Sequence, residues 1–287
     1  RVAIIGYGFV GKALEFGIKD SVEIFKVDPK LGTKTSDLVD FKPDVCFICV
    51  PTPMNDDGSQ DTDILQNVIN DLLTNSISSL IILKSTVLPN NVKKLKTFIP
   101  NLVLNPEFLR ERNANEDFIN SKLIVFGGPK ESTKLAADFY KNYTKCIATN
   151  YRFTDLVSAA LIKYSINAFL ALKVTFFNQL NDVFSESNPS IKWDDFVDII
   201  STDERIGYSH MKVPGIDGKF GYGGPCFPKD CNALIAYSKD IGKPFELLKK
   251  SAEINNKIRK KYKQLSDREI EQNISFFFGI YTCAIKT

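Results

Sequence analysis

One cysteine stands in a setting that suits covalent chemistry. The stretch FGYGGPCFPKD, residues 220–230, places Cys226 between a glycine-rich run and a Pro-Lys-Asp sequence. Glycines let a backbone approach a ligand closely, and a thiolate beside positive charge is a strong nucleophile. Cys226 is therefore either one more buried thiol or a nucleophile held over a substrate.

A lysine and an asparagine form a second candidate pair. Lys163 and Asn167 are four residues apart in a long apolar segment, so a helix there would present both on one face. A cation and an amide on an otherwise apolar helix need a polar partner, and a substrate oxygen would serve. The alternative for the lysine is an aliphatic stem along apolar surface with its ammonium group in water.

The sequence GYGFVG has the spacing of a dinucleotide-binding turn. It follows an apolar strand and opens a helix, so Gly6 would make the tight turn, Gly8 would admit a pyrophosphate, and Gly11 would allow close packing. Asp28 ends the next strand, where a carboxylate accepts both ribose hydroxyls and repels a 2′-phosphate. The pattern predicts NAD in preference to NADP; the alternative is a set of glycines that serves only a tight turn.

Short apolar runs alternate with helix-length segments through the first half of the chain. The runs are RVAIIG, VEIFKVD, DVCFICVP, SLIILKST, NLVLNPEF and KLIVFGG. They predict an α/β fold with an N-terminal doubly wound, Rossmann-like parallel sheet. From about Tyr151, some thirty residues without Gly or Pro predict a long buried helix in an all-helical central domain. We assign residues 1–150 to the cofactor domain, 151–270 to the helical domain and 271–287 to a tail.

Composition restricts the class of function. The 287 residues carry a net charge of +3 without a basic block, which argues against a nucleic-acid partner and favours a small anionic ligand. No run approaches the roughly 18 uninterrupted apolar residues of a membrane span, and no cleavable leader is evident, so we expect a cytoplasmic protein without a membrane partner. The single histidine, His210, argues against a histidine dyad or a metal site, and Cys46 and Cys49 are interpreted as packing residues of a buried strand.

Seven motifs, taken in order, resemble one family. They are GYGFVG, VPTP at 50–53, STVLP at 85–89, NPEFLRE at 105–111, KYSIN at 163–167, RIG at 205–207 and GYGGPCFPKD at 221–230. Their order is similar to that of the UDP-glucose 6-dehydrogenase family, the UDP-glucose/GDP-mannose dehydrogenases, over about the first 260 residues. The resemblance implies a four-electron oxidation of UDP-glucose to UDP-glucuronate for polysaccharide biosynthesis, with two NAD molecules and a cysteine thioester.

The resemblance also implies roles for individual residues. The expected catalytic residues are Cys226 as nucleophile, Lys163 and Asn167 at the oxygen anion, Glu107 as a general base acting through water, and Thr86 and Asp230 for ordering the water and the thiol. The expected cofactor residues are Gly6, Gly8, Phe9, Val10, Gly11, Asp28, Thr86, Glu111 and Lys229. The expected substrate residues are Glu107, Phe108, Leu109, Lys163, Asn167, Tyr222, Gly223 and Arg205, the last reaching into the neighbouring subunit of a homodimer.

Two features depart from the family, and three alternatives stay open. Arg112 stands where the family commonly has Gly, and the family's second, UDP-binding domain is represented at most by a stub at 271–287. Dehydrogenases of UDP-N-acetylmannosamine or GDP-mannose share the chemistry and are poorly separated by these motifs. β-Hydroxyacid dehydrogenases also combine a Rossmann domain with a Lys-x-x-x-Asn helix, but they need no cysteine, so Cys226 argues against them. A third alternative is an NAD-binding protein without turnover that dimerises through the basic helix near residue 250.

Overall fold

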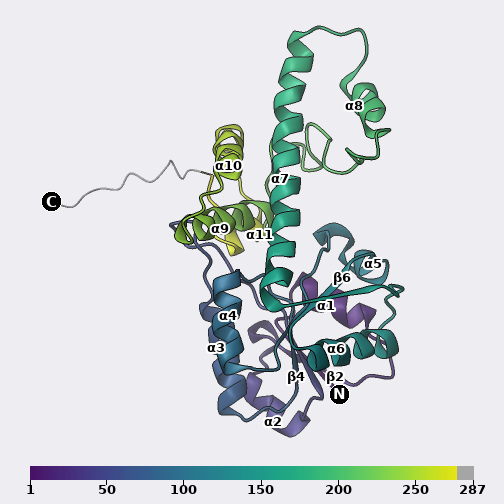
Figure 1. Cartoon of the computed structure of the whole chain (residues 1–287), viewed down its shortest axis with the longest axis vertical. Helices are drawn as coiled ribbons and strands as arrows, with labels where there is room; N and C mark the ends of the chain where they lie inside the picture. The colour runs from purple at the N-terminus through teal and green to yellow at the C-terminus, as the bar shows by residue number, and fades with distance from the viewer. Residues whose placement is uncertain (277–287) are drawn as a thin grey trace, which may run out of the picture. The chain divides into compact units, whose positions relative to one another are not determined.

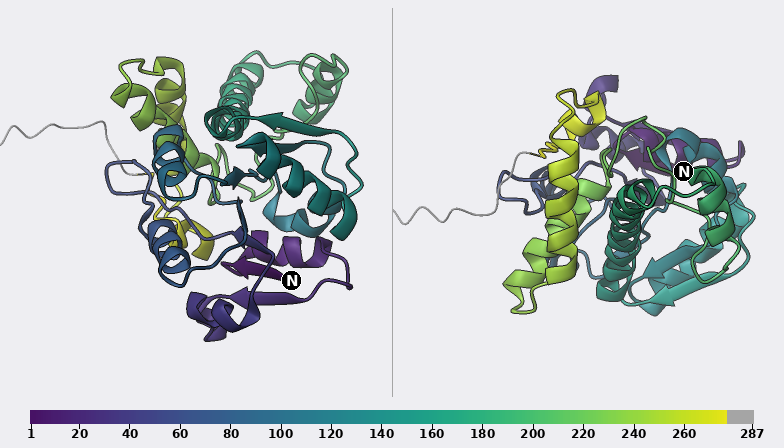
Figure 2. Two further views of the ribbon diagram at one scale, coloured as in Figure 1. Left: turned by 60° about the horizontal axis from the view of Figure 1, so that its bottom comes forward. Right: turned by 90° about the horizontal axis from the view of Figure 1, so that it is seen from above.

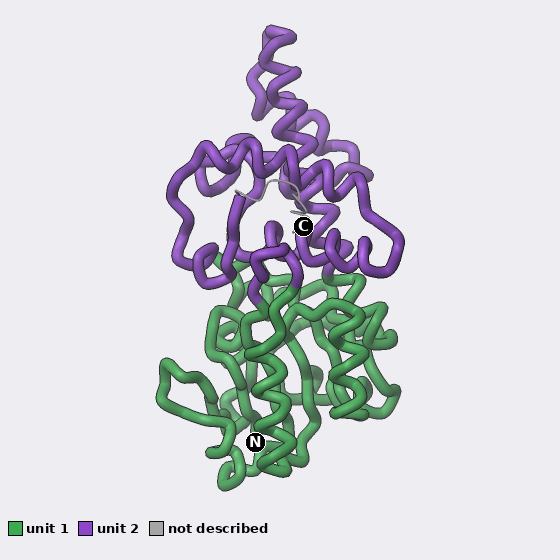
Figure 3. The backbone as a smooth tube through the Cα atoms, turned by 90° about the vertical axis from the view of Figure 1, so that its left-hand side faces the viewer, with its two compact units in different colours: residues 1–52, 60–163 green, residues 53–59, 164–287 purple. Residues whose placement is uncertain are grey.

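The computed structural model describes residues 1–276, and these belong to two compact units (Figure 3). Unit 1 comprises Arg1–Thr52 and Gln60–Lys163. Unit 2 comprises Pro53–Ser59 and the described part of Tyr164–Thr287. Each unit is treated separately below.

Unit 1 is built on a seven-stranded sheet with the order β2-β1-β3-β4-β5-β6-β7 (Figure 1). Its strands are β1 Val2–Ile5, β2 Ile24–Val27, β3 Val45–Ile48, β4 Leu80–Leu83, β5 Val103–Leu104, β6 Ile124–Gly127 and β7 Tyr151–Thr154. The chain places β2 on one side of β1 and β3 on the other, so the direction of winding reverses between β1 and β3. Such a reversal opens a crevice at the carboxyl ends of the strands, where α/β proteins bind ligands. The predicted doubly wound fold is confirmed.

Two strands, β6 and β7, run opposite to β1–β5 and so depart from the predicted parallel sheet. β6 runs antiparallel to β5, with Leu104 opposite Gly127. β5 has only two residues because Asn105 and Pro106 follow it, and proline cannot donate to a strand ladder. The connection carries a short 3₁₀ helix, Glu111–Asn113, and the six-residue helix Ala114–Ile119, and it re-enters the sheet from the side at which β5 ends. Parallel pairing would need a crossover to the opposite end.

Helices cover both faces of this sheet. The helices of unit 1 are α1 Phe9–Gly17, α2 Leu38–Phe41, α3 Asp63–Thr74, α4 Pro89–Phe98, α5 Ala114–Ile119, α6 Lys130–Tyr143 and the beginning of α7 Leu156–Glu186. Successive strand residues point to opposite faces, and the buried side chains accordingly form two clusters. One cluster joins the strands to α2, α3, α4 and the start of α7, and the other joins them to α1, α5 and α6.

The sheet extends past the domain boundary assigned at residue 150. β7 pairs in parallel with β6 from Ile124 opposite Tyr151 to Gly127 opposite Thr154, which places 151–154 in the sheet rather than in a helical segment. The compact unit itself continues to Lys163, within α7. The assignment of functional domains stays a prediction, and residues 277–287 of the expected tail lie outside the described part of the chain.

The predicted long helix is α7, one continuous helix of 31 residues (Figure 2). Its most apolar window has a mean hydropathy of 1.4, so by length and composition alone it could cross a membrane. Its interior also holds buried polar side chains with protein partners, as expected for a core helix of a globular protein. Phe169, Phe176 and Val183 are 65%, 60% and 61% exposed and recur every seven residues, which places them close to one face.

Unit 2 is helical. It contains the rest of α7 with α8 Trp193–Ser201, α9 Phe227–Asp240, α10 Glu246–Arg259 and α11 Asp267–Glu271. A small core forms where Phe177 of α7 meets Val197 of α8, Met211 and Val213. The helix predicted to follow the cysteine motif begins within it, at Phe227, because Pro228 fits the first turn of a helix, where its missing N–H is not needed.

Candidate active site

The glycine-rich turn of unit 1 connects β1 to α1. Gly6 has a φ of 91°, and a Cβ there would lie 2.8 Å from the backbone of Cys49. A Cβ on Gly11 would lie 2.4 Å from the carbonyl oxygen of Gly6. A Cβ on Gly8 would meet nothing within 4 Å. Gly6 and Gly11 are therefore required by internal packing, whereas Gly8 leaves open space before the helix N-terminus, as a pyrophosphate needs.

Asp28 follows β2 and faces this turn. Its Oδ2 accepts from the backbone N–H of Tyr7 at 2.7 Å and its Oδ1 from that of Lys30 at 2.9 Å, so the carboxylate is oriented before any ligand binds. Beside it, burial and a hydrogen bond to Glu15 raise the pKa of Tyr7 to about 12, and Lys26 Nζ contacts Glu15 at 3.0 Å. A fixed carboxylate beyond an open helix N-terminus fits the adenosine ribose and pyrophosphate of NAD. Phe9 and Val10 are half-buried in the first turn of α1.

Glu107 and Lys163 form a buried ion pair within unit 1. Lys163 Nζ donates to the Glu107 backbone oxygen at 2.6 Å and lies 3.1 Å from its Oε1. Oε2 accepts from the backbone N–H of Leu109 at 2.7 Å, and the Phe108 ring centroid lies 5.5 Å from Lys163 Nζ. Lys163 is 4% exposed, so its ammonium does not extend into water. The pair combines a carboxylate that can accept a proton with a cation that can stabilise an oxyanion.

A second buried lysine, which sequence reasoning did not single out, lies behind Glu107. Lys84 Nζ donates to Asn105 Oδ1 at 2.8 Å and contacts the Tyr140 hydroxyl at 3.2 Å. Tyr140 donates to Asn105 Oδ1 at 2.6 Å, and Asn105 Nδ2 donates to the Val125 carbonyl oxygen at 2.8 Å. Burial lowers the pKa of Lys84 to about 8. The only signal in the sequence was a lysine at the end of the apolar strand SLIILKST.

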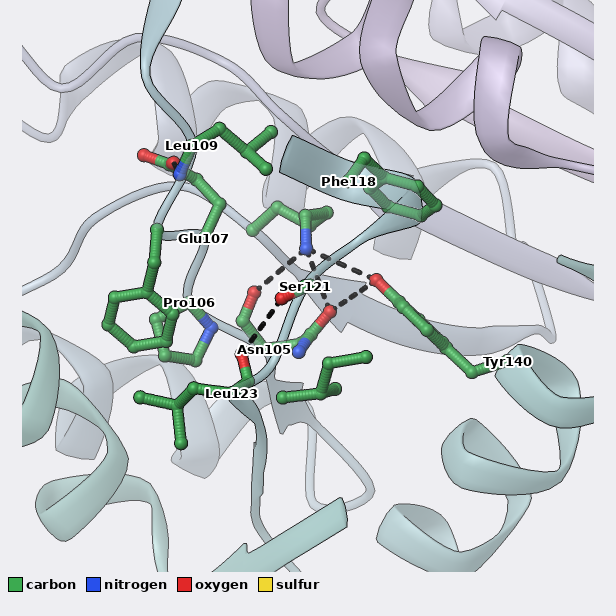
Figure 4. A pocket seen from close by; sticks show the side chains of 11 residues that line it. Asn105, Pro106, Glu107, Leu109, Phe118, Ser121, Leu123 and Tyr140 are labelled. Atoms are coloured by element: carbon green, nitrogen blue, oxygen red, sulfur yellow. Dashed lines mark hydrogen bonds between the residues drawn. The ribbon is translucent and has the colours of Figure 1, made fainter. Parts of the chain in front are cut away.

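A cavity of about 20 Å³ adjoins this network (Figure 4). Asn105, Glu107, Phe118 and Tyr140 contribute to its lining, and the polar ends of Asn105 and Tyr140 point toward one another. Its size suits about one water molecule. The surroundings of Glu107 are therefore compatible with a base that acts through water.

Within unit 2, Cys226 is the N-cap residue of α9. Lys229 and Asp230 follow in the first turn, and the backbone N–H of Asp230 donates to the Cys226 carbonyl oxygen at 3.0 Å. The positive end of a helix dipole favours a thiolate over a thiol at this position. The Asp230 carboxylate is buried between Lys229 Nζ at 2.6 Å and Asn167 Nδ2, also at 2.6 Å. The residues that follow Cys226 thus contribute to a fixed polar cluster in the first turn of α9.

Other expected site residues lie outside these two clusters. Thr86 is half-buried, and its carbonyl oxygen accepts from Thr52 Oγ1 and Gln60 Nε2, both at 2.8 Å. Glu111 is exposed in a short 3₁₀ helix. Arg205 is exposed and makes a 2.5 Å ion pair with Asp203. Tyr222 is buried, 4% exposed, and Gly223 follows it in the loop before Cys226.

Some of the expected catalytic and substrate residues thus form one cluster in each unit. Unit 1 brings together Glu107, Phe108, Leu109 and Lys163. Unit 2 brings together Asn167, Lys229 and Asp230, close in sequence to Cys226. Lys163 is the last residue of unit 1, and Asn167 follows one helical turn later on α7.

Two family models match most of the chain. The NAD binding domain of the UDP-glucose/GDP-mannose dehydrogenase family matches residues 13–144, and the central domain of the same family matches residues 157–257. A UDP-glucose 6-dehydrogenase of Rickettsia bellii is 38% identical over 68% of the chain and 45% of its own length. The UDP-glucose 6-dehydrogenase TuaD of Bacillus subtilis is 32% identical over 85% of the chain and 53% of its own length. The chain thus spans about half the length of the curated relatives it matches.

Solved structures with low sequence identity share the fold. A UDP-glucose dehydrogenase from Pyrobaculum islandicum superimposes with a TM-score of 0.76 at 24% identity, covering 89% of this chain and 68% of the other. The 3-hydroxyisobutyrate dehydrogenase of Mycobacterium tuberculosis gives a TM-score of 0.73 at 15% identity, covering 92% of this chain and 95% of the other. The fold is therefore shared by enzymes that act on different substrates.

Proposed function

Because the chain belongs to the UDP-glucose/GDP-mannose dehydrogenase family and carries its NAD-binding domain, we propose that it performs the NAD-dependent oxidation of UDP-glucose to UDP-glucuronate. UDP-glucose is favoured because the curated relatives at 32% and 38% identity are UDP-glucose 6-dehydrogenases. The observation that carries the proposal is Cys226 at the N-terminus of α9, beside the buried Lys229, Asp230 and Asn167.

The first oxidation converts the primary alcohol to an aldehyde. The alcohol loses a proton and a hydride; NAD, which the glycine-rich turn and Asp28 would hold, would supply the hydride acceptor. Glu107 receives the proton, directly or through a water in the adjoining cavity, while Lys163 stabilises negative charge on the oxygen. Both groups are buried, which strengthens these interactions relative to water.

The second oxidation requires the cysteine. The Cys226 thiolate adds to the aldehyde carbon, forming a carbon–sulfur bond and an oxyanion. The oxyanion re-forms a carbonyl as a second hydride leaves the carbon, which yields a thioester; a second NAD held at the same turn would supply the acceptor. Water then attacks the thioester carbon and expels the thiolate, so the carboxylate is released and Cys226 is regenerated. Lys163 and Asn167 are proposed to stabilise the oxyanions of both stages.

Cys226 also supports this reaction over a single oxidation. The fold is shared with a 3-hydroxyisobutyrate dehydrogenase, so the fold alone leaves both open. A single oxidation to a carbonyl needs no nucleophile. A cysteine that served only to fill the core would be fully buried. Cys226 is only partly buried and stands at a helix N-terminus beside a fixed Lys-Asp pair, so core packing explains it poorly.

We further propose a homodimer in the cytoplasm. Arg205 is exposed, as a residue that reaches into a neighbouring subunit must be. α7 exposes Phe169, Phe176 and Val183 near one face, an apolar row that a second copy of the helix would cover. This row is a stronger candidate interface than α10, the basic helix predicted from the sequence.

The proposal is tested by following NADH formation with the purified chain. UDP-glucose, UDP-N-acetylmannosamine and GDP-mannose are each supplied with NAD, and Cys226→Ala serves as the control. We expect UDP-glucose to give the highest kcat/KM by at least about 10-fold. A higher kcat/KM for either other sugar reassigns the substrate, and no NADH from any of them contradicts the proposed activity.

A further inference from the structure

Side chains hold the loop that leads to Cys226. Four of its backbone N–H groups donate to side chains, namely Phe220 to Tyr262 Oη at 3.0 Å, Gly221 to Asn178 Oδ1 at 2.8 Å, Tyr222 to Asn255 Oδ1 at 2.7 Å and Gly224 to Glu269 Oε1 at 2.8 Å. Asn255 Nδ2 also donates back to the Tyr222 carbonyl oxygen at 2.9 Å. The acceptors come from α7, α10, the segment after α10, and α11. The loop conformation therefore depends on residues distant in sequence.

Arg259, the last residue of α10, lies against this loop. Its side chain is 3% exposed, and its Nη2 makes a 2.7 Å ion pair with Asp217 Oδ2. A Cβ on Gly223 would lie 1.7 Å from Nη2 and 2.5 Å from Cζ of Arg259. Gly223 does not have a left-handed φ, unlike Gly221 and Gly224. The backbone conformation therefore does not require glycine at residue 223, and a side chain there would have to displace the guanidinium group.

The burial of Arg259 is costly, which argues for a role at this position. Nε and Nη1 are buried without a hydrogen-bond partner among residues 1–276. The cation instead lies 6.0 Å from the ring centroid of Tyr262 and 5.8 Å from that of Phe276. Cation–π contacts recover only part of what buried, unsatisfied donors lose. An apolar residue would fill the same space at lower cost, but it could not pair with Asp217.

We propose that Arg259 is a positioning residue for the nucleophile. Its guanidinium group fills the space that a side chain at residue 223 would occupy and ties the loop to Asp217, so that Gly221–Gly224 hold Cys226 in one arrangement. The inference rests on the proposed role of Cys226. It also changes the explanation of Gly223, which the sequence analysis placed among the substrate-binding residues. In this proposal, residue 223 is glycine because Arg259 occupies the space of a side chain.

The two explanations of Gly223 are separated by a double-variant experiment. We compare kcat for Gly223→Ala, Arg259→Ala and the double variant. If Arg259 excludes the methyl group, Gly223→Ala lowers kcat by at least about 10-fold alone but changes it less than about 2-fold in the Arg259→Ala background. If the substrate requires the glycine, the loss is equal in both backgrounds, and that result overturns the proposal.

The control is Ile216→Ala, in the same loop region, where the isoleucine side chain is 74% exposed. It is expected to retain at least about half of the activity. Should Gly223→Ala fail to fold, recovery of folding in the double variant supports the proposal. If Arg259→Ala alone folds but the double variant does not, the result contradicts the proposal.

A second measurement does not depend on turnover. Iodoacetamide alkylates accessible thiolates, and peptide mass spectrometry gives the rate at residue 226 alone. We expect Gly223→Ala to change this rate by at least about 5-fold, and the double variant to match Arg259→Ala. If the unmodified chain oxidises no nucleotide sugar, the proposed function fails while this test still decides the role of Arg259. An unchanged alkylation rate in both Gly223→Ala and Arg259→Ala overturns that role.

Discussion

Replacing Lys84 by methionine should remove a pH dependence from the stability of the protein. Lys84 is 4% exposed and donates to the neutral oxygens of Asn105 and Tyr140. Burial lowers its pKa from 10.5 to about 8, and the nearby Lys163 acts in the same direction. Glu107 acts in the opposite direction. Methionine has a similar length and no charge, so Lys84→Met removes the titration while it keeps most of the volume.

The sign and size follow from proton linkage. Between pH 8 and 10.5 the unfolded chain holds more protons on this lysine than the folded chain does, so the free energy of unfolding rises with pH. A pKa lowered from 10.5 to about 8 changes the free energy of unfolding by about 3 kcal/mol in total, between a pH well below both values and a pH well above both. About 2.5 kcal/mol of this is gained between pH 7 and pH 10. The thiol of Cys49, with its pKa raised by burial to about 12, titrates above this window.

The assay is urea unfolding followed by circular dichroism at several values between pH 7 and pH 10. The free energy of unfolding of the unmodified chain, minus that of Lys84→Met, should increase by about 2.5 kcal/mol over this range. Lys93→Met, at an exposed position on α4, is the control and should leave the difference constant. Parallel curves for the unmodified chain and Lys84→Met would refute the argument that Lys84 is a buried cation with a lowered pKa.

Three further predictions concern the cofactor, the assembly and the intermediate. Because Asp28 repels a 2′-phosphate, calorimetry should find NAD bound at least about 10-fold tighter than NADP. The difference between the two affinities should be smaller in Asp28→Asn. Equal affinities for the unmodified chain would show that Asp28 is not part of the cofactor site. Light scattering should report a dimer that Phe169→Glu or Phe176→Glu dissociates, whereas Leu247→Glu on α10 leaves it intact; a fully active monomer defeats this expectation. Cys226→Ser should accumulate a sugar nucleotide on residue 226, because an alkoxide leaves more slowly than a thiolate. Peptide mass spectrometry after incubation with NAD and UDP-glucose detects the added mass. A peptide of this variant without added mass at position 226 argues against a covalent step.

Local patterns in the sequence were sufficient for the fold and for the motif positions. The apolar runs indicated β1 to β6, whereas β7, Tyr151–Thr154, was missed because residues from Tyr151 were assigned to the helical domain. The strand, glycine turn and Asp28 predicted the NAD-binding domain that the family model matches. These features depend on neighbours within about twenty residues, which is why a single sequence reveals them. The antiparallel β6 was missed, because pairing direction depends on how the connection around Pro106 leaves the sheet.

Contacts between distant residues were not predictable. Lys84 contacts Tyr140, 56 positions away, and nothing in SLIILKST indicates that the lysine turns into the core. Arg259 approaches Gly223 from the end of α10, so the glycine looked like an adaptation to the substrate. In both cases a residue's role depends on a partner that the tertiary fold brings to it, and no periodicity or spacing encodes that partner.

The central claim is that one active site carries out two oxidations through Cys226. The direct measurement is the number of NADH molecules formed per UDP-glucose consumed, for the unmodified chain and for Cys226→Ala. The account predicts two NADH per sugar for the unmodified chain, and at most one for Cys226→Ala, which can reach the aldehyde but lacks the thiolate that makes a second hydride transfer possible. Two NADH per sugar from Cys226→Ala at the unmodified rate would contradict the thioester mechanism and return Cys226 to the structural thiols.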